Sequence, residues 1–338
     1  MTMLYVVMIY LWMAILLYLL LGGADFGAGI IELLTSEKNK SRTRKTMYRA
    51  IGPIWEANHM WLIITVVILF VGFPAIYSTM SVHLHIPLAI MLLGIIARGT
   101  AFAFRNYDAV VDDMQKIYNK IFVYSSFITP LFLGIIAGSA VAGRIDTAAN
   151  NFSDAYIFSW FSIFSISVGF FTVAICGYLA AVFIIGETDN AEDRKIFTRK
   201  ARLMNIVTAI CGVLVFIAAW IEGVPLLVWL FGNVASVIAI VAALITLYLQ
   251  WRTLRRGHTR KIRIYAGFQV AMILLAVTVR HYPNIIILKN GKYLSLLEHA
   301  GQEQTIFYLG VALLAGSVFI LPALYYLMYS FHRKTITL

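Results

Sequence analysis

Long stretches without a charged side chain dominate this sequence. No Asp, Glu, Lys or Arg occurs in eight runs, residues 1–24, 57–97, 121–143, 155–186, 203–221, 223–251, 264–279 and 305–331. A helix needs about 20 apolar residues to cross about 30 Å of hydrocarbon. The run 57–97 is long enough for two crossings, and it is interrupted near Pro74 and in the polar stretch 78–85. The eight runs therefore predict nine transmembrane helices.

The composition excludes a soluble globular protein. Of the 338 residues, 61% are hydrophobic and 13% are charged, and the mean hydropathy is +0.84. Soluble domains average about 45–50% apolar and about 25% charged residues. We therefore expect an all-α integral membrane protein that forms one polytopic domain over residues 1–338. The first run has no basic segment before its apolar core, so we expect it to remain as the first helix.

The basic residues predict the orientation of the chain in the membrane. Of the 27 Lys and Arg residues, 22 lie in alternate connections and the tail, at 38–49, 105–120, 194–202, 252–263 and 333–334. By the positive-inside rule these segments are cytoplasmic, which places the N-terminus outside and the C-terminus in the cytoplasm. Only an odd number of crossings permits this orientation. The net charge of +11 is thereby explained without a nucleic-acid partner.

Two acidic residues interrupt the apolar pattern, Asp25 in the first predicted helix and Glu56 at the start of the second. A charge in hydrocarbon costs roughly 2.5–3.5 kcal/mol on insertion scales, so an intramembrane acid is a candidate functional residue. Asp25 precedes the first basic loop by about ten residues, which places it roughly 15 Å inside the cytoplasmic end. Arg98 lies near the cytoplasmic end of the third helix. The sequence thus predicts that Asp25, Glu56 and Arg98 converge near the cytoplasmic side.

Two glycines stand on either side of Asp25. Gly23 and Gly27 form a GxxxG pair, and such small residues let another helix backbone approach closely in a membrane. We therefore predict that these glycines serve helix packing. The polar residue between them is expected to lie at a close helix contact.

Three histidines raise metal or haem alternatives. Glu56 and His59 are three residues apart and share a helical face, but di-metal carboxylate sites need a second Glu-x-x-His copy and further acids. His83 and His85 lie at an outer boundary, and haem ligation by either has no second signal in support. The sequence contains no Walker A motif, dinucleotide-binding glycine motif or nucleophile elbow. We expect no metal site and no catalytic residue on this chain.

The predicted cluster of Asp25, Glu56 and Arg98 allows two interpretations that can hold together. One is a buried ion-paired network that locks the first three helices to one another. The other is a proton path, in which an acid near the inner side takes a proton from cytoplasmic water and passes it toward the membrane interior. A purely structural scaffold remains as a third interpretation if neutralising the acids changes only the yield.

At these residues the chain resembles subunit II of the cytochrome bd-type quinol oxidases. The second of the matching pieces is the most specific. The pieces are Gly-Ala-Asp-Phe-Gly at 23–27, Pro-Ile-Trp-Glu-Ala-Asn-His-Met-Trp-Leu-Ile at 53–63, Phe-Pro at 73–74 and Arg-Gly-Thr-Ala-Phe-Ala-Phe-Arg at 98–105. Beyond residue 105 the resemblance depends mainly on helix number and on Arg-His-Tyr-Pro at 280–283.

The resemblance implies a partner and a reaction. Family members have two four-helix bundles plus one extra helix, and they pair with a larger, haem-binding subunit I in a bacterial or archaeal cell membrane. The complex oxidises quinol and reduces dioxygen to water, and haem b, haem d and the quinol site belong chiefly to subunit I. Subunit II supports haem insertion and stability, and in some members it lines a proton path near the positions that match Asp25 and Glu56. A structural quinone and a small extra subunit are further options.

This chain departs from the family pattern at two positions. Glu56 stands where Asp is frequent, which keeps the charge and lengthens the reach of the side chain. Gly22 stands where many relatives have an additional acid, and this difference bears on the entrance of the proton path.

The rival class is a stand-alone proton-coupled transporter. Such a protein is expected to have paired broken helices and a midplane binding site. Here the polar residues are predicted near one face of the membrane, and no inverted repeat is visible in the sequence. A co-purifying haem subunit would favour the oxidase, whereas a colourless homo-oligomer would favour the transporter.

Overall fold

The computed structural model describes residues 2–52, 55–107, 114–185, 191–256 and 259–334. The elements are α1 (Thr2–Leu17), η1 (Tyr18–Gly22), α2 (Gly23–Leu33), α3 (Glu37–Ile51), α4 (Trp55–Gly72), α5 (Pro74–His83), α6 (His85–Tyr107), α7 (Met114–Val141), α8 (Phe152–Tyr156), α9 (Ile163–Ile185), α10 (Ala191–Ile221), α11 (Leu226–Phe231), α12 (Val234–Arg256), α13 (Thr259–His281), β1 (Asn284–Ile287), β2 (Tyr293–Ser295) and α14 (Glu303–Lys334).

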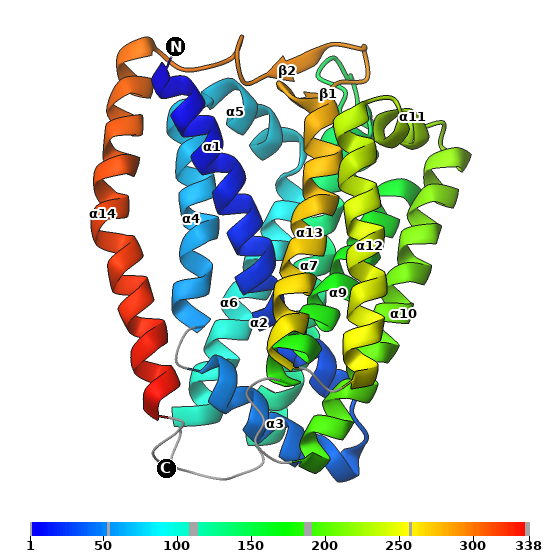
Figure 1. The fold of residues 1–338 in the computed structure, drawn as a ribbon. Coiled ribbons are helices and arrows are strands. Elements are labelled where there is room, and N and C mark those ends of the chain that lie inside the picture. Colours follow the sequence, from blue (N-terminus) through cyan, green and yellow to red (C-terminus); the bar gives the residue numbers. More distant parts are fainter. Residues whose placement is uncertain (1, 53–54, 108–113, 186–190, 257–258, 335–338) are drawn as a thin grey trace.

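Nine crossings within these ranges are long and apolar enough to span a membrane, which confirms the number predicted from the uncharged runs. The first crossing combines α1, η1 and α2, and the others are α4, α6, α7, α9, α10, α12, α13 and α14. The start of α1 and the end of α14 lie at opposite ends of the bundle, as an odd number of crossings requires (Figure 1).

The two ends of the bundle differ in their secondary structure and charge. One end holds β1, β2 and the short helices α5 and α11, and we call it the hairpin end (Figure 1). The surface helix α3, which carries the basic residues of the first predicted loop, lies across the opposite end, which we call the basic end (Figure 1). The predicted orientation, with the basic end in the cytoplasm, stays a prediction.

The first crossing contains a π-helical turn. The turn covers Tyr18–Gly22 and passes directly into α2. A π-turn inside an α-helix is rare and frequent at functional sites. The irregular turn ends immediately before Gly23. Asp25 therefore lies in the first turn after the irregularity.

The segment between α13 and α14 forms an antiparallel hairpin that an all-α prediction does not include. β1 pairs with β2, and Gly291 in the tip adopts a φ of 77° that favours glycine. The hairpin is joined to the segment between α7 and α9 by Lys289, whose ammonium lies 3.0 Å from the carboxylate of Asp146. This hydrogen bond lowers the pKa of Asp146 below its ordinary value. The hairpin thus covers the hairpin end (Figure 1).

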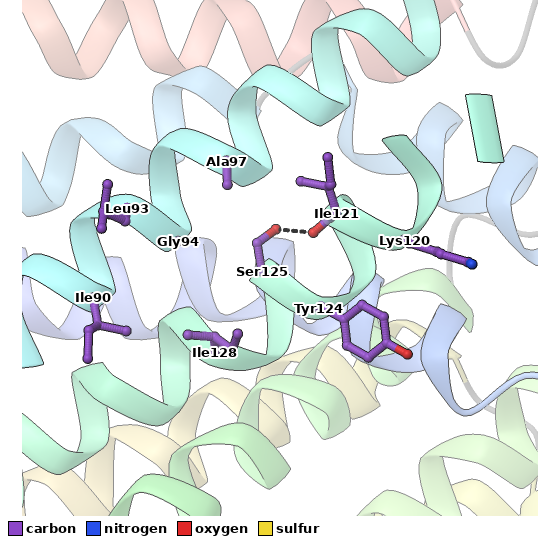
Figure 2. Close-up of a pocket in the computed structure, with 9 residues that line it drawn as sticks. All are labelled: Ile90, Leu93, Gly94, Ala97, Lys120, Ile121, Tyr124, Ser125 and Ile128. Atoms are coloured by element: carbon purple, nitrogen blue, oxygen red, sulfur yellow. Dashed lines mark hydrogen bonds between the residues drawn. The ribbon is translucent and has the colours of Figure 1, made fainter. Parts of the chain in front are cut away.

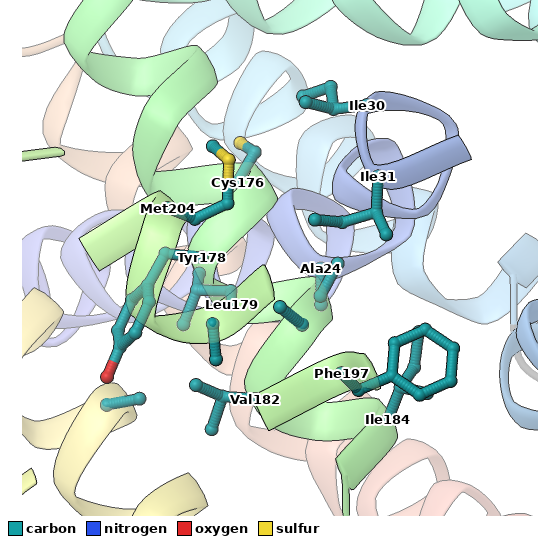
Figure 3. Close-up of a cluster of buried hydrophobic side chains, with 14 of the residues drawn as sticks. Ala24, Ile30, Ile31, Cys176, Tyr178, Leu179, Val182, Ile184, Phe197 and Met204 are labelled. Carbon is teal, nitrogen blue, oxygen red and sulfur yellow. The ribbon is translucent and has the colours of Figure 1, made fainter. Parts of the chain in front are cut away.

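The core centres on α9, which is the most buried of the nine crossings, whereas α14 is the least buried. Buried side chains of α2, α9 and α10 meet there (Figure 3), among them Ile30, Leu179 and Met204. Because lipid tails are as apolar as these side chains, close packing rather than burial from water holds such helices together. The small residues along α2 and α9 are therefore central to the fold.

Glu222 joins α9 to α10 at the hairpin end. Its carboxylate accepts a hydrogen bond from the backbone N–H of Ile163, the first residue of α9, at 2.7 Å, and lies 3.3 Å from the guanidinium of Arg144. Although Glu222 lies in a turn between two crossings, its side chain is only 7% exposed. A carboxylate at this position satisfies an N–H group that has no partner within the helix and interacts favourably with the helix dipole.

Replacing Glu222 by Ala is expected to lower the free energy of unfolding by about 1–2 kcal/mol, the usual cost of a lost N-cap. Thermal unfolding of the purified protein in detergent measures the effect. Glu298 is an exposed acid in the segment that carries the hairpin, and Glu298→Ala is the matched control, for which we expect no change. Equal unfolding temperatures of the two variants would contradict the capping role.

Candidate functional site

An ion pair between Asp25 of α2 and Arg98 of α6 forms the centre of the site. The guanidinium Nη2 of Arg98 donates hydrogen bonds to Asp25 Oδ1 at 2.7 Å and to the Asp25 backbone oxygen at 3.0 Å. The Nε of Arg98 donates to Ser126 Oγ on α7 at 3.1 Å. Both ion-paired side chains are at most 1% exposed. One nearly fully buried arginine therefore joins three helices.

Aromatic rings surround the guanidinium of Arg98. Its Cζ lies 5.2 Å from the ring centre of Phe26 and 4.9 Å from that of Phe122. A cation over the face of an aromatic ring is attracted by the ring quadrupole, and the attraction grows when the cation is removed from water. The rings thus offset part of the cost of burying the charge.

His59 of α4 is the third member of the site. Its Nε2 lies 3.5 Å from Asp25 Oδ2, which is within ion-pair range but long for a hydrogen bond. The imidazole ring is enclosed by aromatic neighbours, with ring centres 5.5 Å away at Phe26, 6.0 Å away at Tyr18 and 6.4 Å away at Trp55. The sequence singled out His59 only as a partner of Glu56 in a metal pair. The sequence signal for His59 as a site residue was its position one helical turn after Glu56.

Several buried polar atoms at this site have no hydrogen-bond partner among the described residues. They are Tyr18 Oη, Asp25 Oδ2, His59 Nδ1, Trp61 Nε1 and Arg98 Nη1. A buried polar group without a partner costs about 1–3 kcal/mol, and most buried polar groups in proteins bond to protein or ordered water. Five such atoms in one region therefore mark a polar site, in which Asp25 Oδ2 is an open acceptor for a hydrogen bond or a proton.

Glu56 does not join this cluster. Its side chain is exposed at the first turn of α4, and no ion pair links it to Asp25 or Arg98 among the described residues. At about 100° per residue, Glu56 lies about 200° around the helix from Asn58, which is buried. Of the three predicted residues, an ion pair joins Asp25 and Arg98, and a role of Glu56 beside them stays a prediction. Glu56 is about 60° around α4 from His59, which faces Asp25.

A second buried acid, Glu32, lies two turns further along α2. Its carboxylate is 1% exposed and accepts hydrogen bonds from Arg44 of α3 at 2.9 Å and from Arg105 of α6 at 3.0 Å. The sequence analysis missed Glu32 because it stands where the first crossing meets the basic loop. The signal in the sequence was a shared spacing: Asp25 and Glu32 are seven residues apart, and so are Arg98 and Arg105.

The two acid–arginine pairs stack along the same pair of helices. Seven residues make about two helical turns, so Asp25 and Glu32 occupy one face of α2, and Arg98 and Arg105 occupy one face of α6. The ring of Phe122 lies between the two guanidinium groups, 4.1 Å from that of Arg105. The stack links the surface helix α3 at the basic end to the buried Asp25.

Gly23 and Gly27 lie against α9. A Cβ on Gly27 would overlap the carbonyl oxygen of Cys176 and would lie 2.6 Å from the Cβ of Ala180, and one on Gly23 would lie 3.3 Å from the Cys176 sulfur. Only glycine permits this approach at Gly27. The contact fixes the position of α2 and thereby the depth of Asp25.

Within the described ranges, no three or more His, Cys, Asp or Glu side chains lie together as a metal site. His59 faces Asp25 and is enclosed by rings, while His83 and His85 pack against Tyr156 at the hairpin end. The Glu56 and His59 pair lacks the further acids that a di-metal site needs.

The fold and the site define a class of helical membrane proteins with nine crossings and acid–arginine pairs buried between them. A family model described as cytochrome bd terminal oxidase subunit II matches residues 3–331. The chain belongs to this family. Together with the nine apolar crossings, this membership makes it a multi-pass protein of the bacterial inner membrane.

Relatives with curated names agree with the family. The chain is similar to the cytochrome bd ubiquinol oxidase subunit 2 of Bacillus subtilis, with 29% identity over 53% of this chain and 55% of the relative. It is also similar to a putative cytochrome bd menaquinol oxidase subunit II of the same species, with 23% identity over 82% of this chain and 81% of the relative. The match thus spans about half of the first relative and most of the second.

A solved structure agrees with the fold. The structure of bd oxidase from Geobacillus thermodenitrificans superposes with a TM-score of 0.78, covering 98% of this chain and 99% of that chain at 22% identity. At this identity the similarity supports the arrangement of helices alone.

Proposed function

We propose that this chain is subunit II of a respiratory complex that oxidises quinol and reduces dioxygen. The family match over residues 3–331 carries this proposal. The relatives named above are a ubiquinol and a menaquinol oxidase subunit, so the substrate class is a quinol. In this arrangement haem b, haem d and the quinol site lie on a partner, subunit I, and this chain supports its assembly.

The second part of the proposal is that Asp25 takes up protons from the cytoplasm. The open Oδ2 of Asp25 faces His59. Glu56 and His59 are three residues apart on α4, and residues at this spacing have Cβ atoms about 5–6 Å apart. Glu56, exposed at the basic end of α4, is then the entrance. A proton passes from water to the Glu56 carboxylate, then to the His59 imidazole, and then to Asp25 Oδ2. This route needs no acid at position 22, where the chain has Gly22, because Glu56 supplies the carboxylate at the entrance.

Neutral variants test this route. Asp25→Asn, His59→Gln and Glu56→Gln are expected to slow quinol-driven oxygen consumption of the purified complex by at least about tenfold, since a positioned proton carrier contributes more than that. Haem content per complex, read from the absorption spectrum, is expected to stay normal in His59→Gln and Glu56→Gln, whereas Asp25→Asn leaves the buried Arg98 without its anion and is expected to lower it. Glu37→Gln, which changes an exposed acid at the basic end, is the control. Normal turnover with normal haem content in all three variants would overturn the proton route.

A stand-alone proton-coupled transporter is the alternative function. Affinity purification of this chain from its native membrane separates the two, because the oxidase predicts a co-purifying haem protein and the transporter a colourless homo-oligomer. The composition of the same preparation tests whether a small extra subunit or a structural quinone is present. We also propose that the nine crossings form two four-helix bundles plus one extra helix, in one domain over residues 1–338. The N-terminus is proposed to lie outside.

A further inference from the structure

A groove of about 410 Å³ runs between α6 and α7 on the outer surface of the bundle (Figure 2). Its volume lies within the range of about 300–1,000 Å³ that is typical of ligand pockets. It is separate from the ion pairs, since neither Asp25 nor Arg98 lines it. The groove is therefore distinct from the ion-pair site.

Small side chains on α6 create the groove. Gly94 and Ala97 form its floor, while Leu93 and Tyr124, which are 64% and 59% exposed, stand at its sides. Gly94 also fixes the spacing of the helices, because a Cβ there would overlap the hydroxyl of Thr129 on α7. The result is a shallow apolar channel between two rows of larger side chains, a shape suited to a hydrocarbon chain.

The polar groups of the groove are confined to one end of it. The hydroxyl of Ser125 is already used, since it donates hydrogen bonds to the backbone oxygens of Ile121 at 2.6 Å and Phe122 at 3.2 Å (Figure 2). The ammonium of Lys120 and the hydroxyl of Tyr124 remain, and both point away from the Ile90 end of the groove (Figure 2). Neither has a hydrogen-bond or ion-pair partner among the described residues.

The depth of the groove matches one leaflet of a bilayer. Lys120 lies near the start of α7 at the basic end, and the eight residues from Lys120 to Ile128 span about 12 Å at 1.5 Å per residue. Half of a hydrocarbon core of about 30 Å is about 15 Å. The cation and the tyrosine thus lie at the level of the lipid headgroups, with the apolar channel beneath them.

We propose that this groove binds an anionic phospholipid from the leaflet at the basic end. One acyl chain lies in the channel over Gly94 and Ala97, and the phosphate group is held by Lys120 and Tyr124. Charge complementarity selects the anionic lipid, because Lys120 is a cation and the channel offers no acceptor or donor further in. A quinone ring would need polar partners within the channel, where the serine is already bonded to backbone.

Native mass spectrometry of the purified complex, reconstituted with equal amounts of phosphatidylglycerol and phosphatidylethanolamine, tests the proposal. Lys120→Gln is expected to retain phosphatidylglycerol about fivefold more weakly, which corresponds to the loss of about one lysine contact at an anionic surface. Ala97→Leu fills the channel and is expected to reduce retention to a similar extent. Lys120→Arg keeps the charge and is expected to retain the lipid.

Two control variants lie away from the groove. Lys292→Gln removes an exposed cation at the hairpin end, and Ala235→Leu enlarges an exposed alanine of α12. Both are expected to keep the bound phosphatidylglycerol. Unchanged retention in Lys120→Gln and Ala97→Leu would overturn the proposal. So would retention of phosphatidylethanolamine in equal amount, release of a quinone from Ala97→Leu, or a cross-link from a cysteine at 97 to a partner chain that covers the groove.

Discussion

Replacing Arg98 by Met is expected to lower the free energy of unfolding by about 3–5 kcal/mol, the range for removing one member of a buried ion pair. The substitution leaves the Asp25 carboxylate without its cation and removes the hydrogen bond to Ser126. Asp25 is fully buried, so solvent does not replace the lost guanidinium. We expect little of this variant to reach the membrane as a folded chain.

Removing the acid as well is expected to restore most of the loss. In the double variant Asp25→Asn, Arg98→Met, no uncompensated charge remains among the rings of Phe26 and Phe122. Replacing both members of a buried pair by neutral groups is often neutral or stabilising. Unfolding in detergent at increasing temperature, followed by loss of helical signal, measures both variants. Arg280→Met removes an exposed arginine at the end of α13 and serves as the control.

The double variant also separates the two roles proposed for Asp25. If the pair only locks α2 to α6, a double variant that folds and holds its partner should consume oxygen at the normal rate. If Asp25 carries protons, the same variant should assemble and turn over slowly. A single Arg98→Met variant that is as stable as the unaltered chain would show that the ion pair contributes nothing to the fold.

The shared level of Asp25 and Arg98 along the bundle, at which they form an ion pair, was predictable from the sequence. Counting residues from the basic loops gives depth, because an α-helix rises a fixed 1.5 Å per residue. Rotation about the helix axis was not predictable in the same way. α4 is apolar around most of its circumference, so its sequence does not indicate which face packs inward or that the Glu56 side chain is exposed.

Contacts between distant segments explain the other residues that the sequence did not reveal. Glu32 is recognised as buried only once α3 brings Arg44 to it. Glu222 caps α9 from a turn that is 59 residues away in the chain. In both cases the local pattern around the acid is that of a solvated boundary residue, and the partner is supplied by the tertiary fold. The two strands of the hairpin between α13 and α14 are short, so they leave little trace in a sequence whose composition is that of transmembrane helices.

The stacked pairs give the basic end a mechanical connection to the buried site. Arg44 belongs to the surface helix α3 and binds Glu32, which shares its helix face with Asp25. Arg105 and Arg98 hold the same two acids from α6. A displacement of α2 along or away from α6 would therefore disturb both pairs at once. The contact that opposes such a displacement is the packing of α2 against α9.

Replacing Gly27 by Ala is expected to destabilise the chain by about 3 kcal/mol or more, at the upper end of the range for overpacking. The added Cβ would meet the backbone oxygen of Cys176 and the Cβ of Ala180. Neither is the end of a flexible side chain, so no change of rotamer relieves the overlap. α2 has to move away from α9, and Asp25, two residues away, moves with it. We expect loss of thermal stability together with loss of turnover.

Two other glycines make the effect specific to this contact. Gly23→Ala places its Cβ 3.3 Å from the Cys176 sulfur, a contact that a small shift relieves, so a smaller loss is expected. Gly267→Ala on α13 meets nothing within 4 Å, and alanine favours a helix interior by roughly 0.5–1 kcal/mol over glycine, so this variant should be equally or more stable. Thermal unfolding of the three variants in one detergent should rank them in that order. If Gly27→Ala unfolds at the same temperature as Gly267→Ala, the close approach of α2 to α9 does not hold the acid in place.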